Sequence, residues 1–128
     1  MRYLAIFKTV ERNQPPTQEE MDRMNALIQE MLAEGTLITT EGCLPSALGA
    51  RVRRSGSEIT VTDGPFTESK EVVGGFAILE ARDRTHVIEL TKRFLAVAGE
   101  GESEIRQLYE APAVVAQDDV REAARSAA

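Results

Sequence analysis

Residues 71–81 read EVVGGFAILEA, the most hydrophobic segment of the chain, and they predict a central β-strand. The pair Gly74–Gly75 in the middle of this segment favours a bulge or a close approach of another backbone. Residues 2–9, RYLAIFKT, predict a second strand. Both strands carry apolar residues on both faces, so each face of the sheet that they form needs cover.

Two helices are predicted on either side of the central segment. Thr17 is a good N-cap, Glu20 completes a capping box with it, and Gly35 supplies the C-terminal stop. Between them, apolar residues recur at helical spacing: Met21, Met24, Leu27, Ile28, Met31 and Leu32. Asp83 can cap a second helix that ends at Gly99. The methionines of the first helix are either ordinary core residues or the wall of an adaptable binding groove.

Shorter segments complete the pattern. Residues 36–41 and 104–111 predict strands, and residues 50–54 and 57–62 predict a hairpin that turns at Ser55–Gly56. The order strand, helix, several strands, helix, strand is that of an α+β fold. It resembles the ferredoxin-like split β-α-β pattern with an extra hairpin, β-α-β-β-β-β-α-β.

The domain is expected to span residues 1–111, followed by a tail at residues 112–128 with the composition of a short helix. Two helices cover one face of the predicted sheet and leave the other bare. The exposed apolar patch would then exceed the few hundred Å² that soluble monomers usually tolerate. A second copy packed sheet to sheet would cover it, so we predict a homodimer.

Composition narrows the class of protein. The chain has 128 residues, 42% hydrophobic and 28% charged, which is typical of one folded domain. Its 15 basic and 21 acidic residues argue against nucleic-acid binding. No stretch approaches the roughly 18–20 apolar residues of a membrane span, and the opening apolar run is too interrupted for a signal peptide. With a single cysteine, Cys43, the expected location is the cytoplasm.

The motif Asp63-Gly64-Pro65-Phe66 follows the predicted hairpin and supplies the candidate site. Asp63 can act there as a catalytic general base or a ligand anchor, or it can be a turn residue. The residues expected to contact a small anionic ligand are Arg51, Gly64, Pro65, Phe66, Ser69 and Lys70. The alternative for this charged group is a solvated cluster of ion pairs at a sheet edge.

This motif belongs to a longer block, VTDGPFTESKEVVGGF at residues 61–76, which joins MRYLAIF at the start and EGCLPSA at residues 41–47. Together they resemble the YCII-related family, and within it the DGPF branch, over roughly residues 1–111. The resemblance implies a dimeric α+β barrel of ferredoxin-like subunits. It also implies enzymatic relatives that act on small cyclic acids and lactones, and a link to sigma factors of the extracytoplasmic-function type.

One departure from that family bears on catalysis. Its enzyme-like members resemble one another in a histidine near the start of the first helix, paired with an aspartate. Here residues 15–22 read PPTQEEMD, and His86 belongs to the first turn of the second helix. Whether the protein is an enzyme therefore stays open. Cys43, which has no partner cysteine or nearby histidine, is expected to be a half-buried thiol, and we predict no metal and no cofactor.

Two functions remain. The first is a small-molecule-binding protein with a pocket between helices and sheet near the DGPF loop, acting on a small anionic or cyclic-acid metabolite if it is an enzyme. The second is a non-catalytic regulatory or interaction module linked to sigma-factor signalling. A concave pocket that holds Asp63 among other polar groups would favour the first function.

Overall fold

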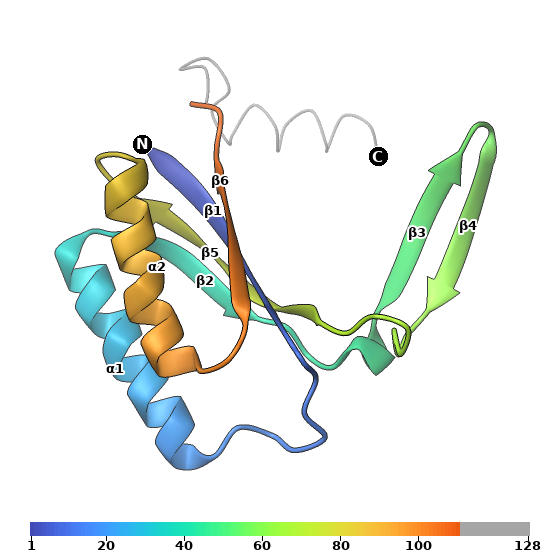
Figure 1. The fold of residues 1–128 in the computed structure, drawn as a ribbon, viewed down its shortest axis with the longest axis horizontal. Helices are drawn as coiled ribbons and strands as arrows, with labels where there is room; N and C mark the ends of the chain where they lie inside the picture. The colour runs from blue at the N-terminus through green and yellow to red at the C-terminus, as the bar shows by residue number, and fades with distance from the viewer. Residues whose placement is uncertain (111–128) are drawn as a thin grey trace, which may run out of the picture.

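A computed structural model describes residues 1–110 of the chain, and within them the fold is mixed α+β (Figure 1). The elements in chain order are β1 (Arg2–Thr9), α1 (Gln18–Glu34), β2 (Leu37–Gly42), the 3₁₀ turn η1 (Ser46–Leu48), β3 (Ala50–Ser55), β4 (Glu58–Asp63), β5 (Val72–Glu80), α2 (Arg84–Ala98) and β6 (Glu102–Gln107). The predicted tail, with its short helix, lies outside the described residues.

Four strands form the main sheet, in the order β2-β5-β1-β6, and every neighbouring pair is antiparallel. The hydrophobic segment around β5 is therefore an interior strand, as its composition predicted. Helices α1 and α2 lie on one face of this sheet and leave the other face without a helix (Figure 1).

The glycine pair of β5 produces both predicted features. Phe7 of β1 pairs with Gly75, and Lys8 pairs with Val73, so that Gly74 is the extra residue of a bulge. On the other side of β5, a Cβ at Gly75 would lie 2.7 Å from the carbonyl oxygen of Glu41. Strand β2 can pair this closely with β5 because residue 75 has no side chain.

Local signals set the ends of α1 as predicted. The Thr17 hydroxyl accepts a hydrogen bond from the Glu20 amide at 3.2 Å, and the Glu20 carboxylate accepts one from the Thr17 amide at 3.4 Å. Gly35 ends the helix in the left-handed conformation, with φ of 78°. Asp83 caps α2 by accepting a hydrogen bond from the His86 amide at 2.8 Å.

Strand β6 differs from its prediction, which placed it at residues 104–111. It begins at Glu102 and ends at Gln107, because its pairing with β1 runs from Lys8↔Glu102 to Tyr3↔Gln107. The apolar residues near the C-terminal end of the predicted segment suggested a longer strand than β1 can pair with.

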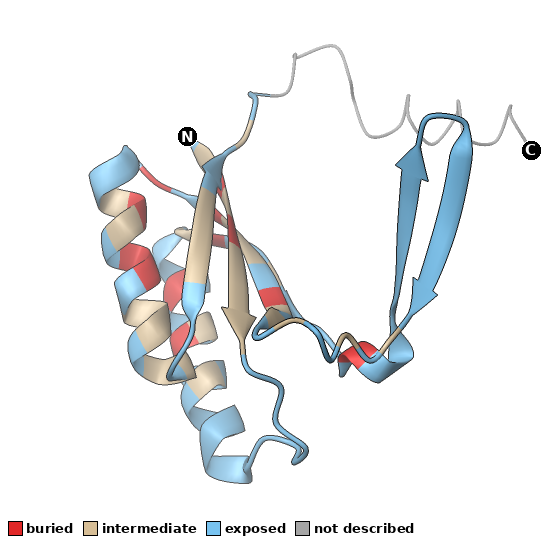
Figure 2. Cartoon of the chain, turned by 45° about the vertical axis from the view of Figure 1, so that its right-hand side comes forward, coloured by how far each residue is buried: buried red, intermediate tan, exposed pale blue. Residues whose placement is uncertain are grey.

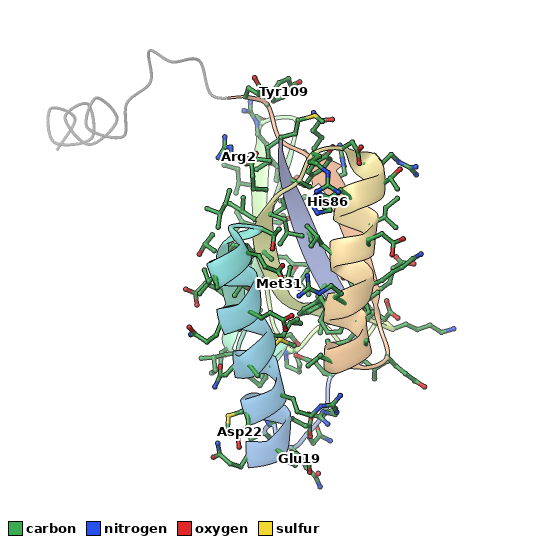
Figure 3. The ribbon with its side chains drawn as sticks, turned by 90° about the vertical axis from the view of Figure 1, so that its left-hand side faces the viewer. Arg2, Glu19, Asp22, Met31, His86 and Tyr109 are labelled. Atoms are coloured by element: carbon green, nitrogen blue, oxygen red, sulfur yellow. The ribbon has the colours of Figure 1, made fainter. Side chains whose placement is uncertain are left out.

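The core lies between the helices and the sheet. Its buried apolar residues are Tyr3, Ala5, Leu27, Met31, Leu37, Leu79, Ala81, Val87 and Leu90. Met31 belongs to this core and points toward it from α1 (Figure 3). Near the start of the same helix, Met24 is half-buried and Met21 is 41% exposed. The packing between α1 and the sheet therefore loosens toward the N-terminal end of the helix.

The helix-free face of the sheet carries an apolar patch, formed by Leu4, Ile6, Phe76 and Ile78. Leu4 pairs with Ile78, and Ile6 pairs with Phe76, so the four side chains share one face. Their neighbours along β1, Tyr3 and Ala5, are buried on the helix side. The patch is thus the second apolar face that the sequence predicted.

Strands β3 and β4 form the predicted hairpin, which is a separate two-stranded sheet. We call residues 50–63 the arm. It extends on the side of the main sheet opposite the helices (Figure 1). Every residue of both strands is exposed (Figure 2). The arm therefore contributes nothing to the core of its own chain.

Candidate functional site

The DGPF segment lies at the base of the arm. Asp63 is the last residue of β4, pairs in register with Ala50, and is exposed. Its carboxylate makes none of the hydrogen bonds that fix the following loop. Those bonds come instead from residues distant in sequence.

The buried Ser46 connects the arm base to the main domain. Its hydroxyl donates a hydrogen bond to Glu11 Oε2 at 2.8 Å, and its amide donates to Glu11 Oε1. The same hydroxyl accepts a hydrogen bond from the Phe66 amide at 3.2 Å. A Cβ at Gly64 would overlap the Ser46 carbonyl oxygen, so the motif requires glycine there. Polar contacts between such distant residues leave no periodic pattern in the sequence, so neither Glu11 nor Ser46 was predicted as a site residue.

Three of the predicted ligand-binding residues come together around Arg51. Its guanidinium carbon lies 3.8 Å from the centre of the Phe66 ring. Its Nη2 donates to the Ser69 hydroxyl at 3.0 Å, and its Nη1 lies 2.5 Å from Glu68 Oε1. The Arg51 and Glu68 side chains are 47% and 65% exposed, so their pair is solvated.

This ion pair leaves little positive charge at Arg51 for an anion. A hydrogen bond from its own backbone amide, and then the Arg51 guanidinium, lower the pKa of Glu68, so this carboxylate stays ionised beside the cation. Of the remaining predicted residues, Gly64 is half-buried, while Pro65 and Lys70 are exposed. The arrangement around Arg51 matches the geometry of the alternative interpretation, a surface cluster of ion pairs.

A cavity of about 580 Å³ lies between the two helices and the sheet. It borders the core directly, since the core residues Ala5, Met31, Leu37, Leu79 and Leu90 also line it. Its wall is mostly apolar and includes Phe7, Met21, Met24, Ile28, Phe94 and Val97. The predicted location between helices and sheet holds, but none of residues 63–70 lines the cavity. Met21, Met24 and Met31 all line the cavity, while Met31 is also buried in the core and Met24 packs against it, so the methionines serve both as core residues and as cavity wall.

Two charged side chains line the cavity on its helix side, Arg12 and Glu20. Glu41 also lies at the cavity, but it pairs with Phe76, so its side chain is on the helix-free face of the sheet. Arg12 Nη2 lies 2.8 Å from Glu20 Oε2, and Nη1 donates to Oε1 at 3.4 Å. The hydrogen bond from Arg12, followed by that from the Thr17 amide, lowers the pKa of Glu20. The only cation on the described cavity wall is therefore already bound by a carboxylate.

One polar group in the cavity lacks a partner. The Ser103 hydroxyl is buried and makes no hydrogen bond within the described residues. By contrast, the Thr91 hydroxyl, also on the wall, donates to the Val87 carbonyl oxygen at 2.7 Å. A buried hydroxyl without a partner is uncommon in folded proteins, and a ligand in the cavity could supply one.

Neither His86 nor Cys43 adds a reactive group to this cavity. His86 Nδ1 accepts a hydrogen bond from the Arg82 amide at 3.0 Å. Figure 3 places His86 at the opposite end of the helix pair from Glu19 and Asp22 at the start of α1. Cys43 is exposed, so the prediction of a half-buried thiol is wrong: the residue follows β2, past its last pair with β5.

Within residues 1–110, no group of three or more His, Cys, Asp or Glu side chains is placed to hold a metal ion. No helix in the described part of the chain is long and apolar enough to cross a bilayer.

Comparison with known proteins gives a family and one weak structural likeness. A family model described as YCII-related domain matches residues 1–112. No curated protein matches the chain. Among solved structures, the crystal structure of CutA from the bacterium Xylella fastidiosa is similar at 16% sequence identity and a TM-score of 0.40, covering 94% of this chain and 91% of that chain.

Proposed function

The chain belongs to the YCII-related domain family, and from that premise we propose that it binds a small molecule in the cavity between its helices and its sheet. The observation that carries this proposal is the cavity itself, with its apolar wall and the unpartnered Ser103 hydroxyl. Its volume falls within the range of about 300–1,000 Å³ that is common for small-molecule sites.

The lining favours a ligand with an apolar body and one group that hydrogen-bonds to Ser103. A small anionic or cyclic-acid ligand, which the sequence predicted, would find its cation in Arg12. Such a ligand has to displace Glu20 from the guanidinium, because the two are already paired at 2.8 Å. Neutral rings and lactones avoid that competition, and we expect them to bind more tightly than their open-chain acids.

Catalysis at Asp63 stays a separate prediction. The residue lies at the arm base rather than in the cavity, and an anion bound there would have to compete with Glu68 for Arg51. Since the matched family model is the broader one, membership of the DGPF branch is also a proposal, and it rests on the tetrapeptide at residues 63–66.

We further propose a ferredoxin-like subunit that dimerises through its sheet. With the arm set aside, the remaining elements run β-α-β-β-α-β, and the sheet order β2-β5-β1-β6 supports this topology. The apolar patch on the helix-free face supports the dimer. The proposed compartment is the cytoplasm, since the exposed thiol of Cys43 suits a reducing environment.

The alternative function is a non-catalytic regulatory or interaction module in sigma-factor signalling. The observation in its favour is the arm, whose exposed apolar residues are a binding surface of the kind that partners cover. A protein that binds partners only through the arm would not be stabilised by any small molecule in the cavity.

A thermal-shift screen against small organic acids, lactones and neutral cyclic compounds tests the cavity. A ligand present at 100 times its Kd should stabilise the fold by about 2.7 kcal/mol. The variant Ala98→Phe, which fills part of the cavity, should lose any hit. Ala96→Phe is the matched control, because Ala96 is exposed on the same helix and does not line the cavity.

The same screen includes Asp63→Asn. A hit that survives in Asp63→Asn and disappears in Ala98→Phe supports the cavity. A hit with the opposite behaviour would move the site to the DGPF loop. If Ala98→Phe and Ala96→Phe bind the compound equally well, the cavity is not the binding site.

A further inference from the structure

We propose that the arm clasps a second copy of this chain, with the face of the hairpin that carries Val52, Ile59 and Val61. This inference rests on the proposed dimer and adds to it a second contact region, at a distance in sequence from the sheet. It also gives the DGPF motif a task, which is to hold the arm in position for that contact.

The arm has one apolar face and one polar face. Val52 pairs with Val61 and Arg54 with Ile59, which places these side chains on the same face. The opposite face carries Arg51, Arg53, Thr60 and Thr62, from the pairs Arg51↔Thr62 and Arg53↔Thr60. Val52, Ile59 and Val61 are 70%, 65% and 63% exposed. Such alternation is typical of a ribbon with one buried face, but nothing in the described part of the chain buries it.

The arm is also held rigidly where it leaves the domain. An isolated two-stranded hairpin is at best marginally stable in water. Here the Glu11–Ser46–Phe66 hydrogen bonds fix one side of its base, and the Gly64 amide donates to the Gly49 carbonyl oxygen at 3.0 Å across the other. These hydrogen bonds hold a fully exposed arm in one direction relative to the main sheet, as a contact with a partner requires.

The placement of the arm favours a second copy as the occupant. It extends on the same side of the main sheet as the apolar patch of Leu4, Ile6, Phe76 and Ile78 (Figure 1). A partner packed on that patch would therefore enter the space that the arm faces. In a two-fold dimer each chain supplies both surfaces, so that both patches and both arms are covered at once.

Charge supports the same occupant. The arm carries three arginines and two acidic residues, the reverse of the balance in the whole chain, which has 15 basic and 21 acidic residues. The border of the apolar patch itself carries both signs, since Glu80 pairs with Arg2 and Leu4 pairs with Arg106. The attraction therefore acts between the basic arm and a second copy whose net charge is -6.

The test is the dimer dissociation constant, measured by sedimentation over a concentration series for the wild type, Val61→Glu and Thr60→Glu. Both variants add one carboxylate to β4, on opposite faces of the arm. Burying an unpaired carboxylate in both halves of a symmetric interface should raise the constant at least about 100-fold for Val61→Glu. The control Thr60→Glu should change it by less than about threefold.

Amide hydrogen exchange reports on the arm itself, whereas sedimentation reports only on the oligomeric state. In the wild type, the amides of the arm should be protected, and in Val61→Glu they should exchange rapidly while those of β1 and β5 remain protected. This pattern also shows that the variant is folded.

The remaining outcomes overturn the proposal in distinguishable ways. A wild-type dimer that Val61→Glu leaves intact removes the arm from the interface while the sheet-mediated dimer stands. A monomeric wild type refutes both. A monomer with protected arm amides would show that residues 111–128 cover the arm, and equal weakening by Thr60→Glu would refute the choice of face.

Discussion

At the scale of single residues, the loop after β4 depends on one backbone position. Gly64 is packed against the backbone of Ser46, the residue that accepts and donates the hydrogen bonds of the arm base. The glycine of the tetrapeptide is thus explained by packing alone, without a ligand. The side chain of Phe66 is likewise explained by the contact of its ring with the Arg51 guanidinium, and its backbone amide donates a hydrogen bond to the Ser46 hydroxyl.

Replacing this glycine by alanine should therefore destabilise the protein strongly. For Gly64→Ala we expect a loss of about 2–3 kcal/mol in the free energy of unfolding, because the new methyl group must displace backbone rather than a flexible side chain. Urea denaturation measures it. The control is Gly42→Ala, where an added Cβ meets no atom within 4 Å, and there the change should stay below about 1 kcal/mol. Equal effects would contradict the packing argument.

The residues that were predicted correctly are those with local signals. The capping box of Thr17 and Glu20 involves neighbours three positions apart, so the sequence contains the whole interaction. The bond between Glu11 and Ser46 spans 35 positions, and nothing in either residue type announces it. The candidate site was predicted around Asp63, with Arg51 among its ligand contacts. That Glu68 pairs with Arg51 at 2.5 Å becomes evident only in the folded chain.

At the scale of elements, the two helices are joined by a charged clamp. Arg93 of α2 lies 2.9 Å from Glu34 and 3.1 Å from Glu30, both on α1. The hydrogen bond from Arg93 holds the pKa of Glu34 below its ordinary value. The clamp lies in the C-terminal part of α1, and within residues 1–110 no ion pair joins the N-terminal part of α1 to α2. Helix α1 is thus tied near its C-terminus, and its N-terminal part is less constrained.

This clamp predicts a pH dependence. A carboxylate whose pKa is lower in the folded state adds stability that is complete above its unfolded value and is lost as the pH falls through the folded value. Between about pH 6 and about pH 3, the wild type should therefore lose more stability than Glu34→Gln. Urea midpoints at a series of pH values measure the difference. The control Glu19→Gln, on the same helix and without an ion pair to α2, should follow the wild type.

Element boundaries show where prediction by periodicity stops. Helix α1 was located correctly because both of its ends are set by its own residues. Strand β6 was predicted at residues 104–111 but spans Glu102–Gln107, because its ends are set by its pairing with β1. A pocket between helices and sheet was predicted near the DGPF loop, but none of residues 63–70 lines the cavity. The methionine spacing of α1 could not locate it, because the same spacing fits a core contact and a cavity wall.

At the scale of the whole molecule, the fold leaves apolar surface on two regions, the sheet patch and the arm. Both surfaces are costly to expose to water. Strands β5 and β1 lie inside the sheet, as expected for segments that are hydrophobic on both faces. The direction of the arm cannot be predicted in this way, because it is set by loop contacts.

A molecule of this kind should gain stability from association. If the dimer forms as proposed, the melting temperature should rise with protein concentration, because mass action favours the folded dimer over the unfolded chain. Calorimetry from about 1 to 100 μM would show the rise, and Val61→Glu should flatten it. A melting temperature that is independent of concentration in the wild type would count against association.

The contacts at the arm base also bear on the order of folding. The hairpin itself closes across a two-residue turn, a local event that takes microseconds. Its attachment requires Glu11 to meet Ser46 across 35 positions and Ser46 to meet Phe66 across 20, and such long loops close at a greater entropic cost. The arm can thus exist as a ribbon before it has a direction. If the arm contacts a second copy as proposed, a newly made chain can associate through its arm only after its own domain has folded. Association is then delayed until the subunit has its native structure.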